Sequence, residues 1–406
     1  MKKNGRGVLW TLRYTLMNVT YFAAFCTIHA CAAVYLLANG FSNTEIGILL
    51  AVANITSAVF QPLIAGIIDR PGWLTNRRFI LISVLIILAG SVLLFVAHDV
   101  KLVVFVVYIL IYMIQFAYQP VMTAICFEYQ KAGCDIYYGL ARGLGSAGFA
   151  VTSVFIGRAI EARGVSLLPV LNILLMALSF LLVFTFRLPK DMPQGETKAP
   201  KETKTAHNNI REFARTYPAF MVFLAATICF FFAHNMINDF MIQIIRNLGG
   251  GEAELGYANF LQAILELPVM ALIGFVLKKI AADKLMVFSG VAFFVKILVL
   301  IFAVNMAGMY FSQSFQLFAY AVFIPTCAYY VSDTMEELDQ VKGQAYVTSA
   351  ITVGGVFSNL ISGVILDHWG IRAMLITGTV ICGIGAVAGA IAMLRLPHHR
   401  TMSRPE

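Results

Sequence analysis

Long apolar runs alternate with short polar segments along the whole chain. RFILISVLIILAGSVLLFVAH (78–98) and LNILLMALSFLLVFTF (171–186) are long enough to cross a bilayer, which takes about 20 apolar residues in a helix. The runs and the polar breaks between them predict an all-α membrane protein with twelve transmembrane helices. The expected helices are 9–36, 44–68, 78–97, 102–127, 137–160, 166–187, 217–245, 254–277, 285–305, 309–333, 344–365 and 372–395.

The composition supports this assignment. The 406 residues are 60% hydrophobic and only 12% charged, about half the charged share of a soluble globular protein. The first apolar run contains Asn18, Tyr21 and His29, so it is too long and too polar for a cleavable signal peptide and is expected to be the first transmembrane helix. The seven cysteines show no paired spacing, which favours reduced packing residues over disulfides or a metal site.

The basic residues gather in alternate connections between the predicted helices. Only Lys101, Arg158, Arg163, Arg246 and Arg372 fall on the opposite side. By the positive-inside rule, this asymmetry predicts a multi-pass protein of the cell membrane with both termini in the cytoplasm. The net charge of +8 is thereby explained by membrane topology, without a nucleic-acid partner.

The longest polar segment, residues 188–216, is rich in lysine and threonine and poor in aromatic residues. It cannot bury a core, so it is expected to be a mobile cytoplasmic linker. It would separate an N-terminal six-helix bundle at 1–187 from a C-terminal six-helix bundle at 217–406.

The two predicted bundles repeat each other in sequence. The aligned pairs are Gly148 and Gly354, Gly157 and Gly363, and Gly164 and Gly370, each 206 residues apart, with Asn54 and Asn259, Ser57 and Gln262, and Gln61 and Glu266, each 205 apart. A repeat of half the chain length predicts two pseudo-symmetric bundles. This is the plan of many secondary transporters, which hold their substrate between the repeats near the middle of the membrane.

Polar residues recur at helical spacing on eight of the predicted helices, namely 1, 2, 4, 5 and their repeat partners 7, 8, 10 and 11. Polar groups within a bilayer are costly and normally face the bundle interior or water. Isolated ones also serve merely to hydrogen-bond neighbouring helices, but stripes that repeat between halves favour a watery central cavity. The candidate substrate-binding residues are Asn18, His29, Tyr108, Tyr112, Gln115, Gln119, Arg142, Phe149, Asn235, Asn238, Asn259, Gln262, Glu266, Gln316 and Asn359.

Arg142 lies within YYGLARGLGSAGFA (137–150), on the same helix face as Ser146 and Phe149. A guanidinium offers five donors in a fixed fork, and beside an aromatic surface it suits hydroxyl-rich ring compounds or carboxylates. The structural alternative is a buried ion pair, with Glu128 as the partner. Substrate contact is the favoured interpretation.

The segment FQPLIAGIIDR with the later NRR (60–78) resembles the loop signature of the major facilitator superfamily. Gly66, Asp69 and Arg70 stand at its glycine, aspartate and basic positions. The resemblance covers nearly the whole chain and implies two bundles around a cavity. It also implies that the charged pair latches a cytoplasmic gate.

Within the superfamily the chain resembles the lactose permease group of oligosaccharide:proton symporters. YGLARGLGSAGF (138–149) is similar to the group's helix-5 motif, which implies that Arg142 is the essential arginine and Phe149 the sugar-stacking aromatic, a tryptophan in the group. SGVAFFVKILVL (289–300) resembles a helix-9 segment whose buried arginine is tied to proton coupling, and Lys296 takes its place.

The chain also departs from that group. Glu266 lies about one turn from the group's essential helix-8 carboxylate, Ala124 replaces its helix-4 glutamate, and Gln316 and Ala319 stand at the histidine and glutamate of its proton site. The group's own proton constellation is therefore not matched. The proton-coupling candidates in this chain are Glu266, Lys296, Asp239 and His234, with His29 as a further one.

The sequence predicts a secondary active transporter that takes up a sugar or short oligosaccharide with protons by alternating access. Aromatic rings beside amides suit sugars, and a carboxyl enclosed at low dielectric is able to carry a proton. The alternatives are an exporter or antiporter of amphipathic drugs, an importer of aromatic acids or nucleosides, and a non-transporting receptor. No nucleophile–base pair, metal-ligand cluster or phosphate-binding loop is recognisable. The expectation is a monomer that is not an enzyme and whose partners are a small molecule, protons and lipid, with no cofactor.

Overall fold

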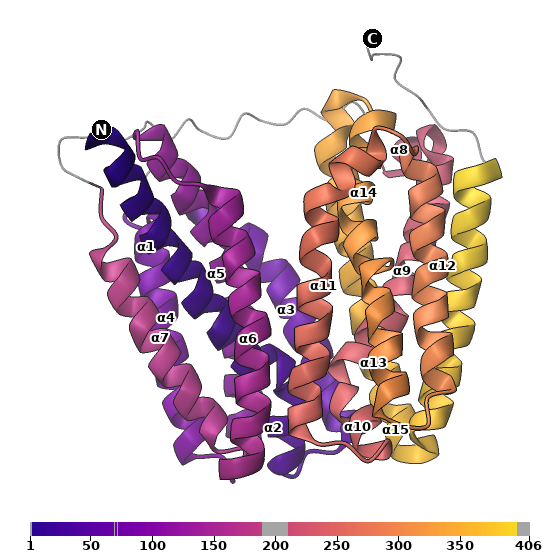
Figure 1. Ribbon diagram of the computed structural model, residues 1–406, viewed down its shortest axis with the longest axis horizontal. Helices are drawn as coiled ribbons and strands as arrows, with labels where there is room; N and C mark the ends of the chain where they lie inside the picture. The colour runs from indigo at the N-terminus through magenta and orange to yellow at the C-terminus, as the bar shows by residue number, and fades with distance from the viewer. Residues whose placement is uncertain (1, 69, 71, 189–209, 396–406) are drawn as a thin grey trace. The chain divides into compact units, whose positions relative to one another are not determined.

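The computed structural model describes residues 2–68, 70, 72–188 and 210–395 (Figure 1). All regular structure within these residues is helical. The chain divides into two compact units. Unit 1 comprises Met1–Lys201 with Gly251–Ala263, and unit 2 comprises Glu202–Gly250 with Ile264–Glu406.

Unit 1 is built from seven helices, a π-helical turn and the first part of α11. They are α1 (Lys2–Phe25), the π-helical turn η1 (Cys26–Ala30), α2 (Ala32–Ala38), α3 (Asn43–Ile68), α4 (Asn76–Val96), α5 (Lys101–Lys131), α6 (Tyr138–Arg163), α7 (Leu167–Thr185) and the beginning of α11 (Glu252–Leu277).

Unit 2 holds the rest of α11 and the remaining helices. They are α8 (Ile210–Thr216), α9 (Pro218–Asp239), α10 (Met241–Asn247), α12 (Ala282–Ile301), α13 (Met306–Ser314), the 3₁₀ turn η2 (Phe315–Leu317), α14 (Tyr320–Thr334) and α15 (Glu337–Arg395). The long α15 bends at Gly370, whose φ of 78° is left-handed. The sequence places a boundary between two helices at that point.

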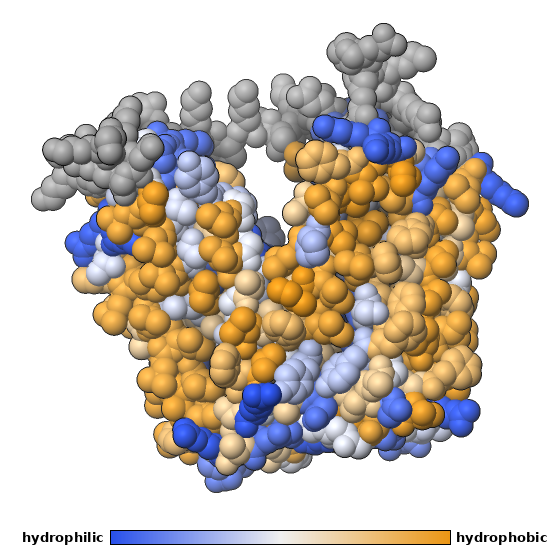
Figure 2. Space-filling model, in the orientation of Figure 1, coloured by the Kyte–Doolittle hydropathy of each residue, from blue (hydrophilic) through white to orange (hydrophobic). Residues whose placement is uncertain are grey.

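Nine helices in the described residues are long and apolar enough to cross a membrane, or up to eleven if each bent pair is one span. Many large apolar side chains on them are exposed, such as Leu63 (60%) and Phe275 (65%). Figure 2 shows hydrophobic residues along the middle of the helices in each unit and hydrophilic ones near helix ends. Such surfaces suit lipid. The predicted all-α membrane fold is confirmed, whereas the count of twelve spans stays a prediction.

Three of the predicted helices are interrupted. The first breaks at η1 and Cys31, and α1–η1 meets α2 at an angle of 48°. The seventh breaks between α9 and α10 at Phe240, and the tenth breaks at η2 and Ala319. The helices expected at 9–36, 217–245 and 309–333 are therefore each composed of more than one helical segment. A broken helix survives in a membrane protein only where its freed backbone groups find other partners.

The interruptions of the first and seventh helices correspond to each other in the two halves of the sequence. Cys31 (φ −103°, ψ 12°) and Phe240 (φ −113°, ψ 25°) adopt nearly the same backbone conformation at the first and seventh helices. Each short helix that follows is succeeded by a left-handed glycine, Gly40 (φ 76°) and Gly249 (φ 83°). The sequence repeat thus extends to local backbone geometry.

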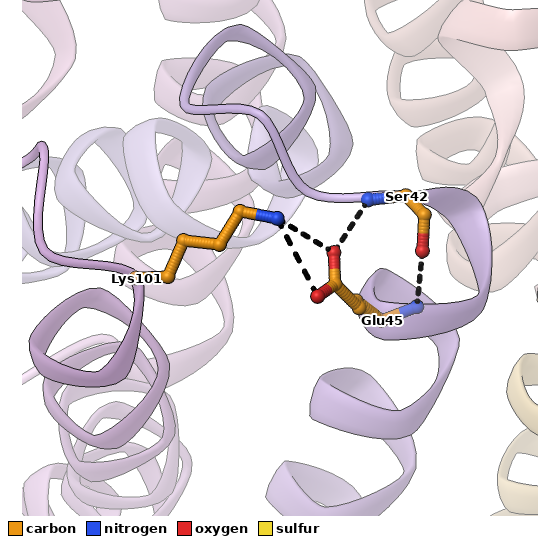
Figure 3. Close-up of polar contacts among 3 residues, drawn as sticks. All are labelled: Ser42, Glu45 and Lys101. Atoms are coloured by element: carbon orange, nitrogen blue, oxygen red, sulfur yellow. Dashed lines mark hydrogen bonds and ion pairs between the residues drawn. The ribbon is translucent and has the colours of Figure 1, made fainter.

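The beginning of α3 shows how the local sequence sets a helix boundary (Figure 3). The N–H of Ser42 donates to the Glu45 carboxylate (2.8 Å), and the N–H of Glu45 donates to Oγ of Ser42 (3.1 Å). This capping box satisfies two backbone donors. Lys101, the first residue of α5, lies 3.1 Å from the same carboxylate, but both side chains are nearly half exposed, so the pair adds little stability.

The predicted linker at 188–216 lies mostly outside the described residues. Its final part, which was expected to be unstructured, forms α8. Phe213 supplies the physical reason, because its side chain is fully buried and its ring packs against Tyr217 and Tyr346.

Candidate functional site

The candidate residues divide between the two units. Unit 1 contains Asn18, His29, Tyr108, Tyr112, Gln115, Gln119, Arg142, Phe149, Asn259 and Gln262. Unit 2 contains Asn235, Asn238, Glu266, Gln316 and Asn359, together with His234, Asp239 and Lys296.

Arg142 is held in a defined orientation on α6. Its Nη1 donates to Oγ of Ser146 (2.8 Å), one turn further along, and its Cζ lies 4.3 Å from the ring centroid of Phe22 on α1. Gly145 permits this arrangement, because a Cβ there would lie 2.9 Å from the Phe22 ring and 3.0 Å from Asn18. The close approach of α1 and α6 therefore places an aromatic face beneath the guanidinium.

The ion pair between Arg142 and Glu128 is not formed. The Glu128 carboxylate instead accepts a hydrogen bond from Nδ2 of Asn76 (3.0 Å). Arg142 remains partly exposed, as does Phe149, seven residues along the same helix. Both side chains are therefore accessible to a ligand.

His29 lies in the π-helical turn η1, within a group of aromatic rings. Its imidazole stacks on Phe25 at 3.6 Å and 7°, and the rings of Tyr112 and Phe116 on α5 lie 3.9 and 4.9 Å away. His29 also has Gln115 as its polar neighbour. Both imidazole nitrogens and the whole Gln115 amide are buried without a hydrogen bond of ordinary geometry in the described residues.

Other candidates in unit 1 have structural partners. The hydroxyl of Tyr108 donates to the carbonyl of Ile28, and Tyr112 donates to Oδ1 of Asn54 (3.5 Å). Nδ2 of Asn18 donates to the carbonyl of Tyr14 on its own helix (2.9 Å). Tyr108 is thus a residue that supports the π-helical turn, since Ile28 belongs to it.

The remaining unit 1 candidates lie on α5 and α11. Gln119 is partly exposed, as is Asn259, while Gln262 is 8% exposed. The nearby start of α11 is bound to α6: Oγ of Ser153 donates to the carbonyl of Gly256 (2.9 Å). These positions are compatible with the predicted stripes, but no hydrogen bond joins them to Arg142 in the described residues.

In unit 2, three candidates form a continuous chain. Nζ of Lys296 on α12 donates to Oε1 of Gln316 (2.7 Å), and Nε2 of Gln316 donates to Oε1 of Glu266 on α11 (2.8 Å). Lys296 and Gln316 are 1% and 2% exposed. Because a buried charge requires a partner, the amide serves as a bridge between the ammonium and the carboxylate.

The break in the tenth helix positions this bridge. Gln316 belongs to η2, and the carbonyl of Ala319 just after it accepts a hydrogen bond from Oγ of Ser289 (2.8 Å). The carbonyl of Lys296 accepts from Oγ of Ser312 (2.7 Å). Two serine hydroxyls thus fix α12 against the interrupted helix around the Lys296–Gln316 contact.

A second polar group in unit 2 lies where α9 ends. Nδ2 of Asn238 donates to Nε2 of His234 (2.9 Å), whose ring stacks on Tyr320 at 5.0 Å and 12°. Asp239 is the last residue of α9, and the Asn359 amide on α15 is its polar neighbour. Asn235 donates to the carbonyl of Phe231 on its own helix (2.9 Å).

The gating residues inferred from the superfamily signature are only partly described. Asp69 lies outside the described residues. Gly66 is exposed, and a Cβ there would meet no described atom within 4 Å. Arg70 is also exposed. No latch is therefore visible at this signature in the part of the chain that the structure covers.

Sequence reasoning left some participants out of the site. Phe22 follows Asn18 by four residues on the same stripe, so its contact with Arg142 had a signal, the shared helix face. Tyr320 and Phe116 had the same kind of signal, since they follow Gln316 and Tyr112 by four residues, but their contacts with His234 and His29 depend on other helices. Within the described residues, no group of three or more His, Cys, Asp or Glu is suited to hold a metal ion.

Comparisons with known proteins agree with this architecture. The profile described as "MFS_1 like family" matches residues 9–376, while no curated protein sequence matches the chain significantly. The nucleoside transporter NupG superposes with a TM-score of 0.79 at 15% identity, covering 96% of this chain and 100% of that one.

Two further solved structures are similar. An auto-inhibited POT family peptide transporter gives a TM-score of 0.77 at 12% identity, over 98% of this chain and 99% of that one. A bacterial homolog of the human lysosomal transporter Spinster, inward-facing and unoccupied, gives 0.69 at 13% identity, over 96% and 97%. The predicted superfamily is confirmed, and the narrower resemblance to the lactose permease group stays a prediction. The chain belongs to the MFS_1 like family and is a membrane transporter of the MFS type.

Proposed function

We propose that this transporter takes up a small ring compound that carries hydroxyl groups, driven by protons. The observation that carries the proposal is the oriented Arg142 guanidinium, bonded to Ser146 and stacked over Phe22. A cation held in this way presents its remaining donors to a ligand, while neighbouring aromatic faces offer a surface for a flat ring.

A nucleoside is the substrate class that fits best. It combines ribose hydroxyls, which suit arginine and amide side chains, with a planar base that stacks on aromatic rings. The aromatic group around His29 adds such rings in the same unit. The likeness to the nucleoside transporter NupG supports this choice, alongside the residue chemistry.

A sugar or short oligosaccharide is the second candidate. The helix-5 segment that holds Arg142 and Phe149 favours it, because an arginine with an aromatic face seven residues away also suits a pyranose. Phe149 retains a stacking face but has no ring N–H to donate.

Proton coupling is proposed to act through Glu266. Its carboxylate accepts from Gln316, whose carbonyl holds Lys296. Protonation of Glu266 removes a negative acceptor from the bridge, so the position of the amide changes with the protonation state. The hydrogen bond from Lys296 to the same amide changes with it.

The test is uptake by purified protein in proteoliposomes with an imposed pH gradient. Labelled uridine is expected to accumulate, unlabelled nucleosides to compete, and a protonophore to abolish accumulation. Labelled disaccharide in parallel vesicles distinguishes the second candidate. Failure of both solutes to enter, with outward movement of amphipathic dyes instead, would contradict the proposal and favour export.

A further inference from the structure

The end of α9 presents a carboxylate where a helix disfavours one. Asp239 is the final residue of this 22-residue helix, and the chain breaks at Phe240 before α10 begins. The C-terminal end of a helix carries partial negative charge, and its last carbonyl oxygens have no donor within the helix. A carboxylate at that end therefore needs a positive partner.

Among the residues that the structure describes, no basic side chain pairs with the Asp239 carboxylate. The ion pairs formed among the described residues do not involve Asp239. Its neighbour Asn359 is neutral. The imidazole of His234 lies on the same helix, but its Nε2 is engaged by the amide of Asn238.

Two amide oxygens beside Asp239 also lack donors. Asn359 is 0% exposed, and neither atom of its amide forms a hydrogen bond of ordinary geometry in the described residues. Asn238 uses its amide nitrogen for His234, which leaves its buried Oδ1 unpartnered. Unpaired buried amides are destabilising unless something satisfies them.

We propose that the Asp239 carboxylate, Oδ1 of Asn238 and Oδ1 of Asn359 form a sodium-ion site at the break between α9 and α10. Hard monovalent and divalent cations prefer carboxylate and carbonyl oxygens, and interrupted membrane helices supply such oxygens at their C-terminal ends. One Na⁺ compensates the carboxylate and also satisfies several acceptor oxygens. A proton bound by Asp239 would also compensate the carboxylate, but its single O–H donor would satisfy only one of the two amide oxygens.

The repeat offers an internal comparison. The break at Cys31 in the first helix has the same backbone conformation as the break at Phe240, and the residue before Cys31 is Ala30. A carboxylate is therefore not required to form such a break. The Asp239 carboxylate has no counterpart at the equivalent break in unit 1. We therefore assign it a function specific to unit 2, which goes beyond the proton coupling proposed for Glu266.

Sodium binding is measured on the purified full-length protein without organic substrate. Unfolding temperatures are compared in NaCl, KCl and choline chloride at equal ionic strength and constant pH, and binding of ²²Na⁺ is measured directly. A ligand that binds the folded state raises its unfolding temperature. The expectation is a saturable upward shift in NaCl alone, with matching ²²Na⁺ binding.

Variants locate the site. Asp239→Asn is expected to abolish both the shift and ²²Na⁺ binding, and Asn359→Leu to raise the half-saturating Na⁺ concentration at least about tenfold. Asp99→Asn, which removes an 88%-exposed carboxylate, is the matched control and should behave as wild type.

Several results would overturn the proposal. They are an equal response of the wild type to K⁺, no ²²Na⁺ binding by the wild type, or full binding by a folded Asn359→Leu variant. If Asp239→Asn fails to fold, the Na⁺ titrations of the wild type and of Asn359→Leu still test the proposed site. Because no organic substrate is present, each outcome is independent of the nucleoside proposal.

Discussion

The guanidinium of Arg142 lies over the ring of Phe22, with 4.3 Å between Cζ and the ring centroid, and bonds Ser146. We predict that Arg142→Lys lowers uptake at least about thirtyfold, since lysine keeps the charge but loses the planar fork of donors, and a hydrogen bond to a charged group is worth roughly 2 kcal/mol. Phe22→Leu should lower it about two- to fivefold, because an exposed cation–π contact contributes about 0.5–1 kcal/mol.

Initial uptake rates in cells test both changes, with membrane insertion checked by fluorescence of a fused reporter. Arg13→Lys is the matched control, since Arg13 also lies over aromatic rings, those of Trp10 and Phe186, but at another part of the unit. Normal uptake by inserted Arg142→Lys protein would refute the role assigned to this arginine.

Glu266, Gln316 and Lys296 form one hydrogen-bonded chain. We predict that Glu266→Gln abolishes uphill accumulation but preserves exchange, because the carboxylate is the proposed proton carrier. Gln316→Leu should abolish accumulation as well, since it separates the two charges. The measurements are pH-gradient-driven uptake and counterflow in proteoliposomes. Glu45→Gln, which weakens an exposed ion pair and keeps a residue suited to the capping box, is the control. Uphill uptake equal to wild type in Glu266→Gln would exclude the carrier role.

Gly157 on α6 packs directly on the backbone of α11, and a Cβ there would collide with the carbonyl oxygen of Glu252. We predict that Gly157→Ala lowers the free energy of unfolding by about 1–3 kcal/mol, the usual cost of overpacking. Thermal unfolding of the purified protein tests this.

Gly139 on the same helix provides the matched control. Its added Cβ would meet no described atom within 4 Å, so Gly139→Ala should be neutral or stabilise the helix by up to about 1 kcal/mol. Equal unfolding temperatures for the two variants would contradict the close packing of α6 on α11.

Tyr217, just before α9, donates to the carboxylate of Asp339 (3.3 Å), which is 0% exposed. Tyr217→Phe removes a donor from a buried charge, and we predict a loss of about 1–3 kcal/mol in the free energy of unfolding. Tyr137→Phe, at a 67%-exposed side chain, is the control. Chemical denaturation measures both; indistinguishable midpoints would show that the bond contributes nothing.

Burial, together with nearby Asp339, raises the pKa of Tyr217 above its ordinary value of 10.0. The phenol therefore stays protonated in the folded protein at pH values where the unfolded chain has begun to ionise. The contribution of Tyr217 to stability should be constant below about pH 10 and fall above it. Denaturation midpoints of wild type and Tyr217→Phe should accordingly converge only at alkaline pH.

Hydrophobic patterning predicted the membrane class and most helix positions, because spans of bilayer length leave a strong local signal. The glycine repeat was equally informative: Gly164 and Gly370, paired by spacing, are both left-handed. The helix breaks were not predicted. Their formation depends on distant partners, such as Ser289, whose hydroxyl meets the carbonyl of Ala319 thirty residues away.

The site was predicted in parts. The shared face of Arg142 and Ser146 follows from helical spacing alone. The bridge through Gln316 was not foreseen, since it joins residues on three separate elements. Asn172 on α7 was missed as well; it links Thr27 and Ser91 by hydrogen bonds inside unit 1, and a single polar residue in an apolar run gives no indication of its partners.

The π-helical turn that contains His29 sets the rotation of the helical residues that follow it. A π-helical turn holds one more residue than an ordinary α-helical one, and each residue advances an α-helix by about 100°. Without the additional residue, everything beyond Ala30 would rotate by that amount, and the Tyr35 hydroxyl would lose its acceptor at Leu94. The additional residue offsets this rotation. His29 therefore lies against the aromatic rings of α5, while Tyr35, beyond the break, still contacts α4.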